Sequence, residues 1–192
     1  MIDNESNYLK AIREQYESYP YPPRNAEDER HRLILTETES IGKISHYCFN
    51  GRLDVNNNFR VLVAGGGTGD QTIFLAEQLR GYNAEVVYLD LSTASMDIAK
   101  RRAEIRGLEN ITWVHGSILD VQKYGLGKFD YINSCGVLMI LADPSEGLMA
   151  LKSCLKESAA MGIMVYAQYG RTGVYHMQEL MRLINMSESD IH

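Results

Sequence analysis

The chain has 192 residues, of which 45% are hydrophobic and 23% are charged, and this balance is typical of a single globular domain. The formal net charge of −6 provides no excess of basic residues for a nucleic acid, and no apolar run is long enough to span a bilayer. Cys48, Cys135 and Cys154 are too widely spaced for a disulfide framework or a zinc site, so no metal is expected. No apolar signal segment follows Asp3 and Glu5, and we therefore expect a cytoplasmic protein that binds neither nucleic acid nor membrane.

Residues 1–58 are expected to form a helical extension that acts as a lid. Apolar side chains at four-residue spacing predict a helix over residues 5–19. The members of this stripe are Tyr8, Ile12 and Tyr16. The proline-rich stretch 19–23 ends the helix, because proline has no amide donor and its ring disfavours a helical neighbour. A second helix is predicted over residues 26–49.

The remainder of the chain, residues 59–192, alternates between strands and helices. Strands are predicted over residues 59–64, 85–90, 112–115, 129–134 and 162–168. Helices are predicted over residues 70–80, 93–106, 144–157 and 173–185. This alternation predicts a doubly wound, mostly parallel α/β sheet of the Rossmann type, preceded by the helical extension.

Local signals mark several of these helices. Ser92 and Asp143 are predicted N-caps, since a short polar side chain can accept a hydrogen bond from the first helical turn. A cluster of arginines in the helix 93–106 is predicted to lie on a solvated face and not to form a binding patch. The cluster consists of Arg101, Arg102 and Arg106.

A glycine-rich turn follows the first strand, where such a sheet binds its ligand. The run Val61-Leu-Val-Ala-Gly-Gly-Gly-Thr-Gly-Asp70 does not fit the dinucleotide pattern G-x-G-x-x-G, and it has no P-loop lysine. Its spacing is G-x-G-x-G, at Gly65, Gly67 and Gly69. Asp70 at the start of a helix would repel a pyrophosphate but not a cationic sulfonium. The turn therefore favours S-adenosylmethionine (SAM) over a dinucleotide, and a tight strand–helix turn without a ligand is the alternative.

The second predicted strand ends in Asp90, about twenty residues after the glycines, as in nucleotide-binding sheets. A carboxylate at this place can accept hydrogen bonds from both hydroxyls of a ribose. Dehydrogenases share the feature, so it indicates an adenosine-type ligand without selecting one. A cap for the next helix is the alternative role.

Four segments appear in the order in which class I SAM-dependent methyltransferases carry their cofactor motifs, and the chain resembles that family over roughly residues 59–185. These segments are Val61–Asp70, Tyr88–Ser92, Asn110–Asp120 and Lys128–Leu138. The stretch Gln15–Pro23, with its Tyr-Pro-Tyr-Pro, is similar to a segment that precedes the core in one bacterial methyltransferase subgroup.

The resemblance implies a role for each matching position. Gly65, Gly67 and Gly69 would line the methionine part of SAM, with Asp70 beside them, and Asp90 would hold the ribose. The adenine would lie against Leu91, with Ser117 and Ile118 at its edge, and the transferable methyl would lie near Ser134 and Cys135. Apart from the resemblance, Tyr16, Tyr19 and Tyr21 could fold over the cofactor as the lid, because aromatic faces attract a sulfonium; ordinary packing of aromatic side chains is the alternative.

The sequence departs from the family pattern at two positions. Many members have an acid in place of Val63 and an aspartate in place of Ser117. Valine removes an anchor behind the site, whereas serine can still accept a hydrogen bond from the adenine amino group.

The acceptor of the methyl group is left open by the sequence. The histidines at 46, 115 and 176 are weak candidates for a general base, and no catalytic residue is assigned. The segment Asn133–Gly136 lacks the Asn/Asp-Pro-Pro-aromatic motif of certain amide and exocyclic-amine methyltransferases, which disfavours a DNA base or a glutamine. We expect a methyltransferase with a small-molecule acceptor. A non-catalytic SAM- or nucleoside-binding module and an NAD-dependent oxidoreductase are the alternatives.

The family's sheet normally ends with a further strand pair, which this sequence lacks before His192. We expect either a fragment of a longer chain or a sheet edge that is covered in another way, for example by a second copy. An open apolar strand edge would otherwise be prone to association.

Overall fold

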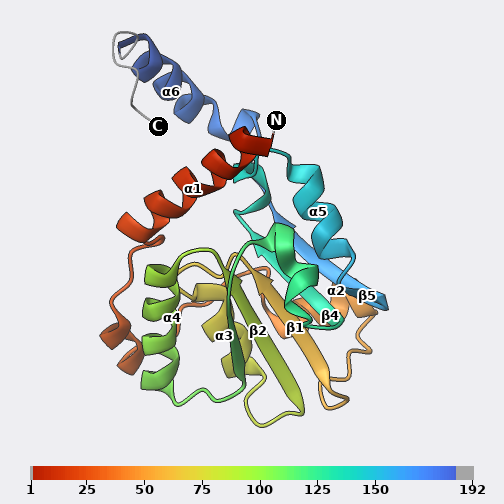
Figure 1. Cartoon of the computed structure of the whole chain (residues 1–192). Coiled ribbons are helices and arrows are strands. Elements are labelled where there is room, and N and C mark those ends of the chain that lie inside the picture. The colour runs from red at the N-terminus through yellow and green to blue at the C-terminus, as the bar shows by residue number, and fades with distance from the viewer. Residues whose placement is uncertain (1, 185–192) are drawn as a thin grey trace.

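The computed structural model describes residues 2–184, with side chains from Tyr8 onward. Its centre is a five-stranded sheet in the order β3-β2-β1-β4-β5, with every pair of neighbours parallel (Figure 1). The strands are β1 (Phe59–Ala64), β2 (Ala84–Asp90), β3 (Ile111–His115), β4 (Phe129–Cys135) and β5 (Leu155–Met164). The chain order reverses between β1 and β4, and this is where a doubly wound sheet opens a crevice for a ligand. The predicted fold class is confirmed.

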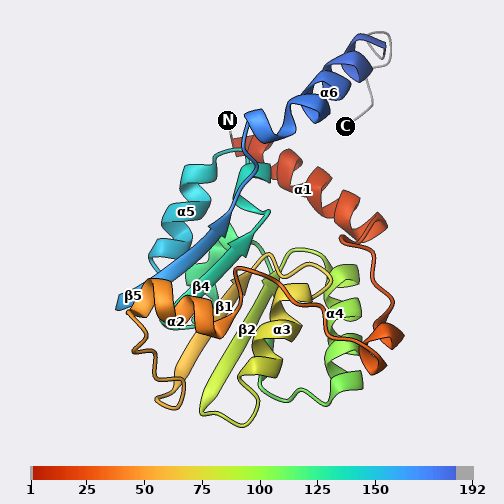
Figure 2. The ribbon, with the colours of Figure 1, turned by 180° about the vertical axis from the view of Figure 1, so that it is seen from behind.

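Helices cover both faces of the sheet, as Figures 1 and 2 show. One face packs against α2 (Ile41–Phe49), α3 (Asp70–Gln78) and α4 (Thr93–Arg106). The opposite face packs against η2 (Ile118–Tyr124) and α5 (Pro144–Lys152). The central strands are thus covered on both sides, which explains why their sequences are apolar without alternation.

The remaining helices complete the structure. They are α1 (Ile2–Ser18), η1 (Ala26–Arg30), η3 (Leu138–Ile140), η4 (Tyr169–Arg171) and α6 (Thr172–Ile184). Among them, η3 contributes Leu138 to the core on the α5 side of the sheet. The helix α6 extends away from the sheet, beyond α1 (Figures 1 and 2). No helix in the described part of the chain is long and apolar enough to cross a membrane.

The predicted N-caps are confirmed. Ser92 Oγ accepts from the amide of Ser95 at 3.1 Å, and Asp143 Oδ1 accepts from the amide of Ser145 at 2.7 Å. The predicted bounds of α3, α4, β1 and β2 agree with the structure to within two residues, because caps and apolar runs are local signals.

The predicted helix over residues 26–49 is wrong. Only its ends are helical, as η1 and α2, and residues 31–40 cross the sheet face without regular structure. Tertiary partners hold this segment: the Tyr131 hydroxyl donates to the carbonyl of Thr38, and the Gln78 side chain contacts the backbone of Glu39 and Ile41. Contacts to distant residues have replaced the helical hydrogen bonds.

The strand predicted over residues 162–168 begins and ends later than the observed strand β5, which runs from Leu155 to Met164. The helix α5 ends at Lys152, and Phe129 in β4 already donates to the carbonyl of Cys154 at 2.8 Å. Residues 155–157, which were predicted to be helical, therefore open β5, and the pairing of β4 with β5 has a register shift between Phe129 and Tyr131.

The arginine cluster of α4 is partly buried, which corrects the prediction of a solvated face. Arg102 is 1% exposed, and its guanidinium contacts carboxylates of Glu29 at 2.6 Å and Asp70 at 2.7 Å. Arg106 also pairs with Glu29, whereas Arg101 is exposed. Carboxylates from η1 and α3 make this burial possible, since a charge in the interior needs a partner.

Candidate active site

The glycine turn lies at the carboxyl end of β1 and is packed too closely for side chains. A Cβ at Gly66 would lie 2.3 Å from the Tyr88 ring, and the Tyr88 hydroxyl donates to the carbonyl of Gly67 at 2.7 Å. Gly69, the N-cap of α3, has a φ of +102°, which side chains rarely adopt. The glycines therefore allow the turn to pack closely against Tyr88 and, at Gly67, against the carbonyl of Tyr21.

Asp90 ends β2 beside this turn. Its Oδ2 accepts from the amide of Gly67 at 2.7 Å, and its Oδ1 accepts from the amide of Ser92 at 2.8 Å. Burial raises the pKa of Asp90 above its ordinary value, although the amides of Ser92 and Gly67 oppose the shift. Each carboxylate oxygen keeps a lone pair for a further donor, which is what the two hydroxyls of a ribose require.

Asp70 is engaged within the protein. Arg24 donates to its carboxylate from Nε and Nη2, at 2.9 and 2.6 Å, and Arg102 donates from Nη1 at 2.7 Å. Burial would raise the pKa of Asp70, but hydrogen bonds from Arg24 and Arg102 outweigh burial and lower it. Because these two guanidinium groups neutralise the charge of the Asp70 carboxylate, Asp70 would repel a pyrophosphate only weakly. The preference for SAM over a dinucleotide therefore depends on the spacing of the glycines.

The N-terminal segment is fastened to the glycine turn by hydrogen bonds. Thr68 Oγ1 donates to the carbonyl of Pro22 at 2.6 Å, and the Thr68 amide donates to the carbonyl of Tyr21 at 3.4 Å. The ion pair between Arg24 and Asp70 holds the same segment. The Tyr21 side chain is 62% exposed, so its backbone makes these contacts with the turn and its ring remains available.

The helix α1 crosses the carboxyl edge of the sheet. At one end, the Glu17 carboxylate accepts from the amides of Thr93 and Ala94 at the start of α4, at 2.6 and 3.0 Å. At the other end, the Tyr8 hydroxyl donates to the carbonyl of Ile140 in η3 at 2.9 Å. The helix thus bridges the two sides of the edge at which Asp90 lies.

Tyr16 of α1 belongs to this neighbourhood. Burial raises the pKa of its hydroxyl, and the surrounding Tyr166, Asp90 and Tyr21 add to the shift. The backbone of Tyr16 is also fastened beside Asp90, because its carbonyl accepts from Ser92 Oγ at 3.2 Å. This arrangement is consistent with the predicted lid, which remains a prediction.

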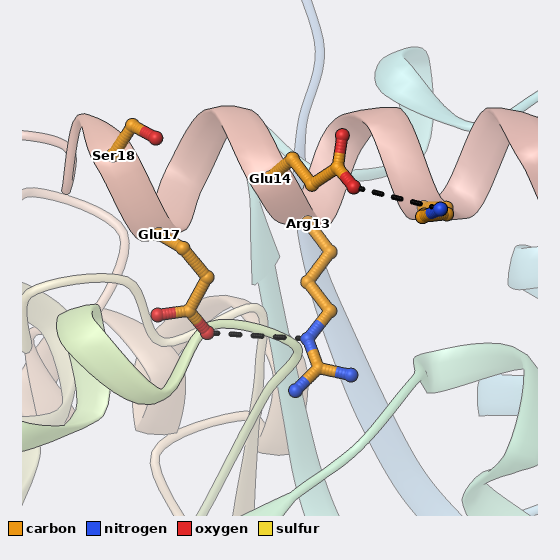
Figure 3. Close-up of a pocket in the computed structure, with 5 residues that line it drawn as sticks. Arg13, Glu14, Glu17 and Ser18 are labelled. Atoms are coloured by element: carbon orange, nitrogen blue, oxygen red, sulfur yellow. Dashed lines mark ion pairs between the residues drawn. The ribbon is translucent and has the colours of Figure 1, made fainter.

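A hollow of about 320 Å³ lies on α1 itself (Figure 3). It is lined by Lys10, Arg13, Glu14, Glu17 and Ser18. Arg13 and Glu17 form an ion pair of 4.0 Å across it. Because the lining comes from α1 alone and contains no residue of the glycine turn, we do not assign the cofactor to this hollow.

The other predicted cofactor residues lie at the ends of β2, β3 and β4. Leu91 is half-buried, and its carbonyl accepts from His115 Nε2 at 2.9 Å. Ser117 Oγ caps η2 by accepting from the amide of Leu119 at 3.2 Å, so one of its lone pairs is already in use. Ile118, the first residue of η2, is 5% exposed and packs in the core.

At the end of β4, Ser134 is fully buried and Cys135 is half-buried. Burial raises the pKa of the Cys135 thiol, and the charge of Glu39 adds to this shift. Within the described part of the chain, Ser134 Oγ and Asn133 Oδ1 are buried without a hydrogen-bond partner. The β4 end is therefore a polar position with unused hydrogen-bonding capacity.

Sequence reasoning did not single out Glu17, Arg24 and Glu39. Glu17 caps a helix that begins more than seventy residues away, and Arg24 pairs with Asp70, which lies 46 residues further along the chain. Glu39 is 1% exposed and contacts β4. No local pattern in the sequence marks such residues.

The chain is similar to several known proteins. The family model described as a methyltransferase domain matches residues 62–161, which include the glycine turn, Asp90 and the β4 end. An uncharacterised protein of Synechococcus sp. is 34% identical over 177 residues, which cover 91% of this chain and 41% of the relative. The tRNA 5-carboxymethoxyuridine methyltransferase of Escherichia coli is 37% identical over 112 residues, or 58% of this chain and 41% of the relative. The chain thus spans about two fifths of the length of these curated relatives.

Among solved structures, PKMT2 from Rickettsia typhi in complex with AdoHcy superposes with a TM-score of 0.63 at 22% identity, over 90% of this chain and 32% of that chain. At this identity the likeness concerns the fold. The family is shown by the family model, which matches half of the sequence. The chain belongs to the methyltransferase domain family, and its fold is that of the class I SAM-dependent methyltransferases.

Proposed function

We propose that this chain binds SAM at the glycine turn and transfers its methyl group to a small molecule. Asp90 would accept hydrogen bonds from the ribose hydroxyls, and the turn would lie along the methionine part, with Leu91, Ser117 and Ile118 around the adenine. The observation that supports this most is the Asp90 carboxylate, which is held by the amides of Gly67 and Ser92 with lone pairs free at the sheet edge. In the same proposal, residues 1–58 form the extension that closes over the core at 59–192.

The reaction itself requires alignment above all. A lone pair of the acceptor attacks the methyl carbon, the carbon–sulfur bond breaks, and its electron pair stays on sulfur as the neutral thioether of S-adenosylhomocysteine (SAH). Holding the two reactants in line is worth roughly 7–11 kcal/mol of the barrier. A general base is needed only for an acceptor that still carries its proton at neutral pH.

A small acceptor suits the edge of this sheet. The helix α1 bridges that edge through Glu17 at α4 and Tyr8 at η3, which limits the space above Asp90. The net charge of −6 gives no electrostatic attraction to a polyanion. The Escherichia coli relative, by its name, acts on a tRNA nucleoside, so tRNA is the acceptor to be tested against this proposal.

The test is to incubate the purified protein with SAM carrying a labelled methyl group, together with either a small-metabolite extract or total tRNA. We expect label in the small-metabolite fraction and none in tRNA. An Asp90→Ala variant is the matched control and should transfer no label. Label in tRNA alone would contradict the small-molecule acceptor. Binding of SAM without transfer to either fraction would favour the non-catalytic module.

A further inference from the structure

The backbone donors of the glycine turn are used within the protein. Each amide of residues 65–69 donates to another protein group, over distances of 2.7–3.4 Å. The acceptors are the carbonyls of Leu89, Tyr21 and Gly66 and the carboxylate of Asp90. A turn that binds a phosphate does so with free amides, and residues 65–69 have none to offer. This turn therefore contributes to a ligand site through its shape and through the groups that it holds in place.

Gly67 is held at both of its backbone polar groups by a single strand. Its amide donates to Asp90 Oδ2 at 2.7 Å, and its carbonyl accepts from the Tyr88 hydroxyl at 2.7 Å. Tyr88 and Asp90 are two residues apart in β2, so their side chains leave the strand on the same face. The strand thus fixes the two peptide groups that flank the Cα of Gly67, and one of these groups in turn fixes the Asp90 carboxylate.

The Tyr88 side chain is itself held firmly. It has no exposed surface, and its ring lies so close to Gly66 that a Cβ there would approach to 2.3 Å. The ring also contacts that of Trp113, with the centroids 4.9 Å apart. Burial raises the pKa of the Tyr88 hydroxyl above its ordinary value, and the charge of Asp90 adds to this shift. The hydroxyl therefore keeps its proton and acts as the donor to Gly67.

We propose that Tyr88 is a positioning residue for cofactor binding, which orients the Asp90 carboxylate through Gly67. This inference rests on the proposed function, in which that carboxylate accepts from the ribose hydroxyls. Tyr88 lies beneath the turn without exposed surface, so it acts through Gly67 and not by contact with the ligand. Without its hydroxyl, the Gly67 carbonyl is free to turn and the Gly67 amide can leave Asp90. The carboxylate must then be ordered again when the ligand binds, and this cost lowers the affinity.

The test is Tyr88→Phe, which removes only the hydroxyl. We expect the affinity for SAH, measured by calorimetry, to fall about tenfold. Tyr131→Phe is the matched control, because Tyr131 is also buried and its hydroxyl donates to the carbonyl of Thr38 at 3.3 Å instead of to the turn. It should lose stability in the same way and keep the parental affinity. Amide hydrogen exchange followed by NMR should be faster at Gly67 in Tyr88→Phe and unchanged there in Tyr131→Phe.

A folded Tyr88→Phe protein with parental affinity for SAH, or an equal loss of affinity in both variants, would overturn the inference. If Tyr88→Phe does not fold, the wild-type protein without ligand decides: a Gly67 amide protected from exchange supports the role of Tyr88, and an unprotected one overturns it. Failure of the wild-type protein to bind SAM and SAH would instead contradict the proposed function, which keeps the two failures apart.

Discussion

Replacement of Asp90 by alanine is expected to remove tight cofactor binding while the domain stays folded. The carboxylate would accept from two ribose hydroxyls, and hydrogen bonds to a charged group contribute roughly 1.5–3 kcal/mol each. A loss of about 3 kcal/mol or more corresponds to an affinity at least ~100-fold weaker. Calorimetry with SAH measures this loss, and a melting curve checks the fold.

Asp97→Ala is the control for Asp90→Ala, since Asp97 is an exposed acid on α4 and its removal should leave affinity unchanged. The pH dependence offers a further check. Burial raises the pKa of Asp90, so its carboxylate takes up a proton at a higher pH than an ordinary aspartate, and affinity should begin to fall correspondingly early as the solution is acidified. Parent-like binding by Asp90→Ala would show that the ribose lies elsewhere.

Replacement of Arg102 by methionine is expected to be the most destabilising change in the molecule. Arg102 is 1% exposed and contacts Glu29, Asp70 and the carbonyl of Thr68. Methionine fills much of the space but leaves buried carboxylates without this partner, and breaking such a pair costs about 3–5 kcal/mol. Urea unfolding followed by circular dichroism measures the free energy.

Arg101→Met is the matched control, one residue earlier on the same helix. Arg101 is exposed and lies 3.6 Å from Glu27, and such a surface pair contributes about 0–1 kcal/mol. The partner Asp70 also predicts a pH effect. Its pKa in the folded state is lowered, so its stabilisation is complete above roughly pH 4 and is lost as the pH falls through the folded value. Similar unfolding free energies for Arg102→Met and Arg101→Met would be incompatible with a buried network.

Much of the sheet follows from local signals in the sequence. The predicted runs at 59–64 and 85–90 end in a glycine turn and in Asp90, and the structure places the turn at the end of β1, beside the switch point, and Asp90 at the end of the neighbouring strand β2. Ser92 and Asp143 were identified from capping chemistry alone. Glycine spacing, strand ends and caps depend on neighbours in sequence, and they led to the correct family.

The features that sequence reasoning missed all depend on distant partners. Residues 31–40 have the composition of a helix, yet contacts with β4 and α3 hold them in an irregular path. Arg102 belongs to a charged cluster that is typical of a solvated face, and only the arrival of Glu29 and Asp70 allows its burial. Glu39 reaches β4 from more than ninety residues away in sequence. Such pairings become visible only once the chain is folded.

The measurement that tests the central claim most directly is calorimetry of the wild-type protein with SAM, SAH and NAD under one set of conditions. The G-x-G-x-G turn and the Asp90 carboxylate predict that SAM and SAH bind at a single site and that NAD does not bind. Binding of NAD with an affinity equal to that of SAH, or no binding of SAM and SAH at all, would contradict the assignment of this site to SAM.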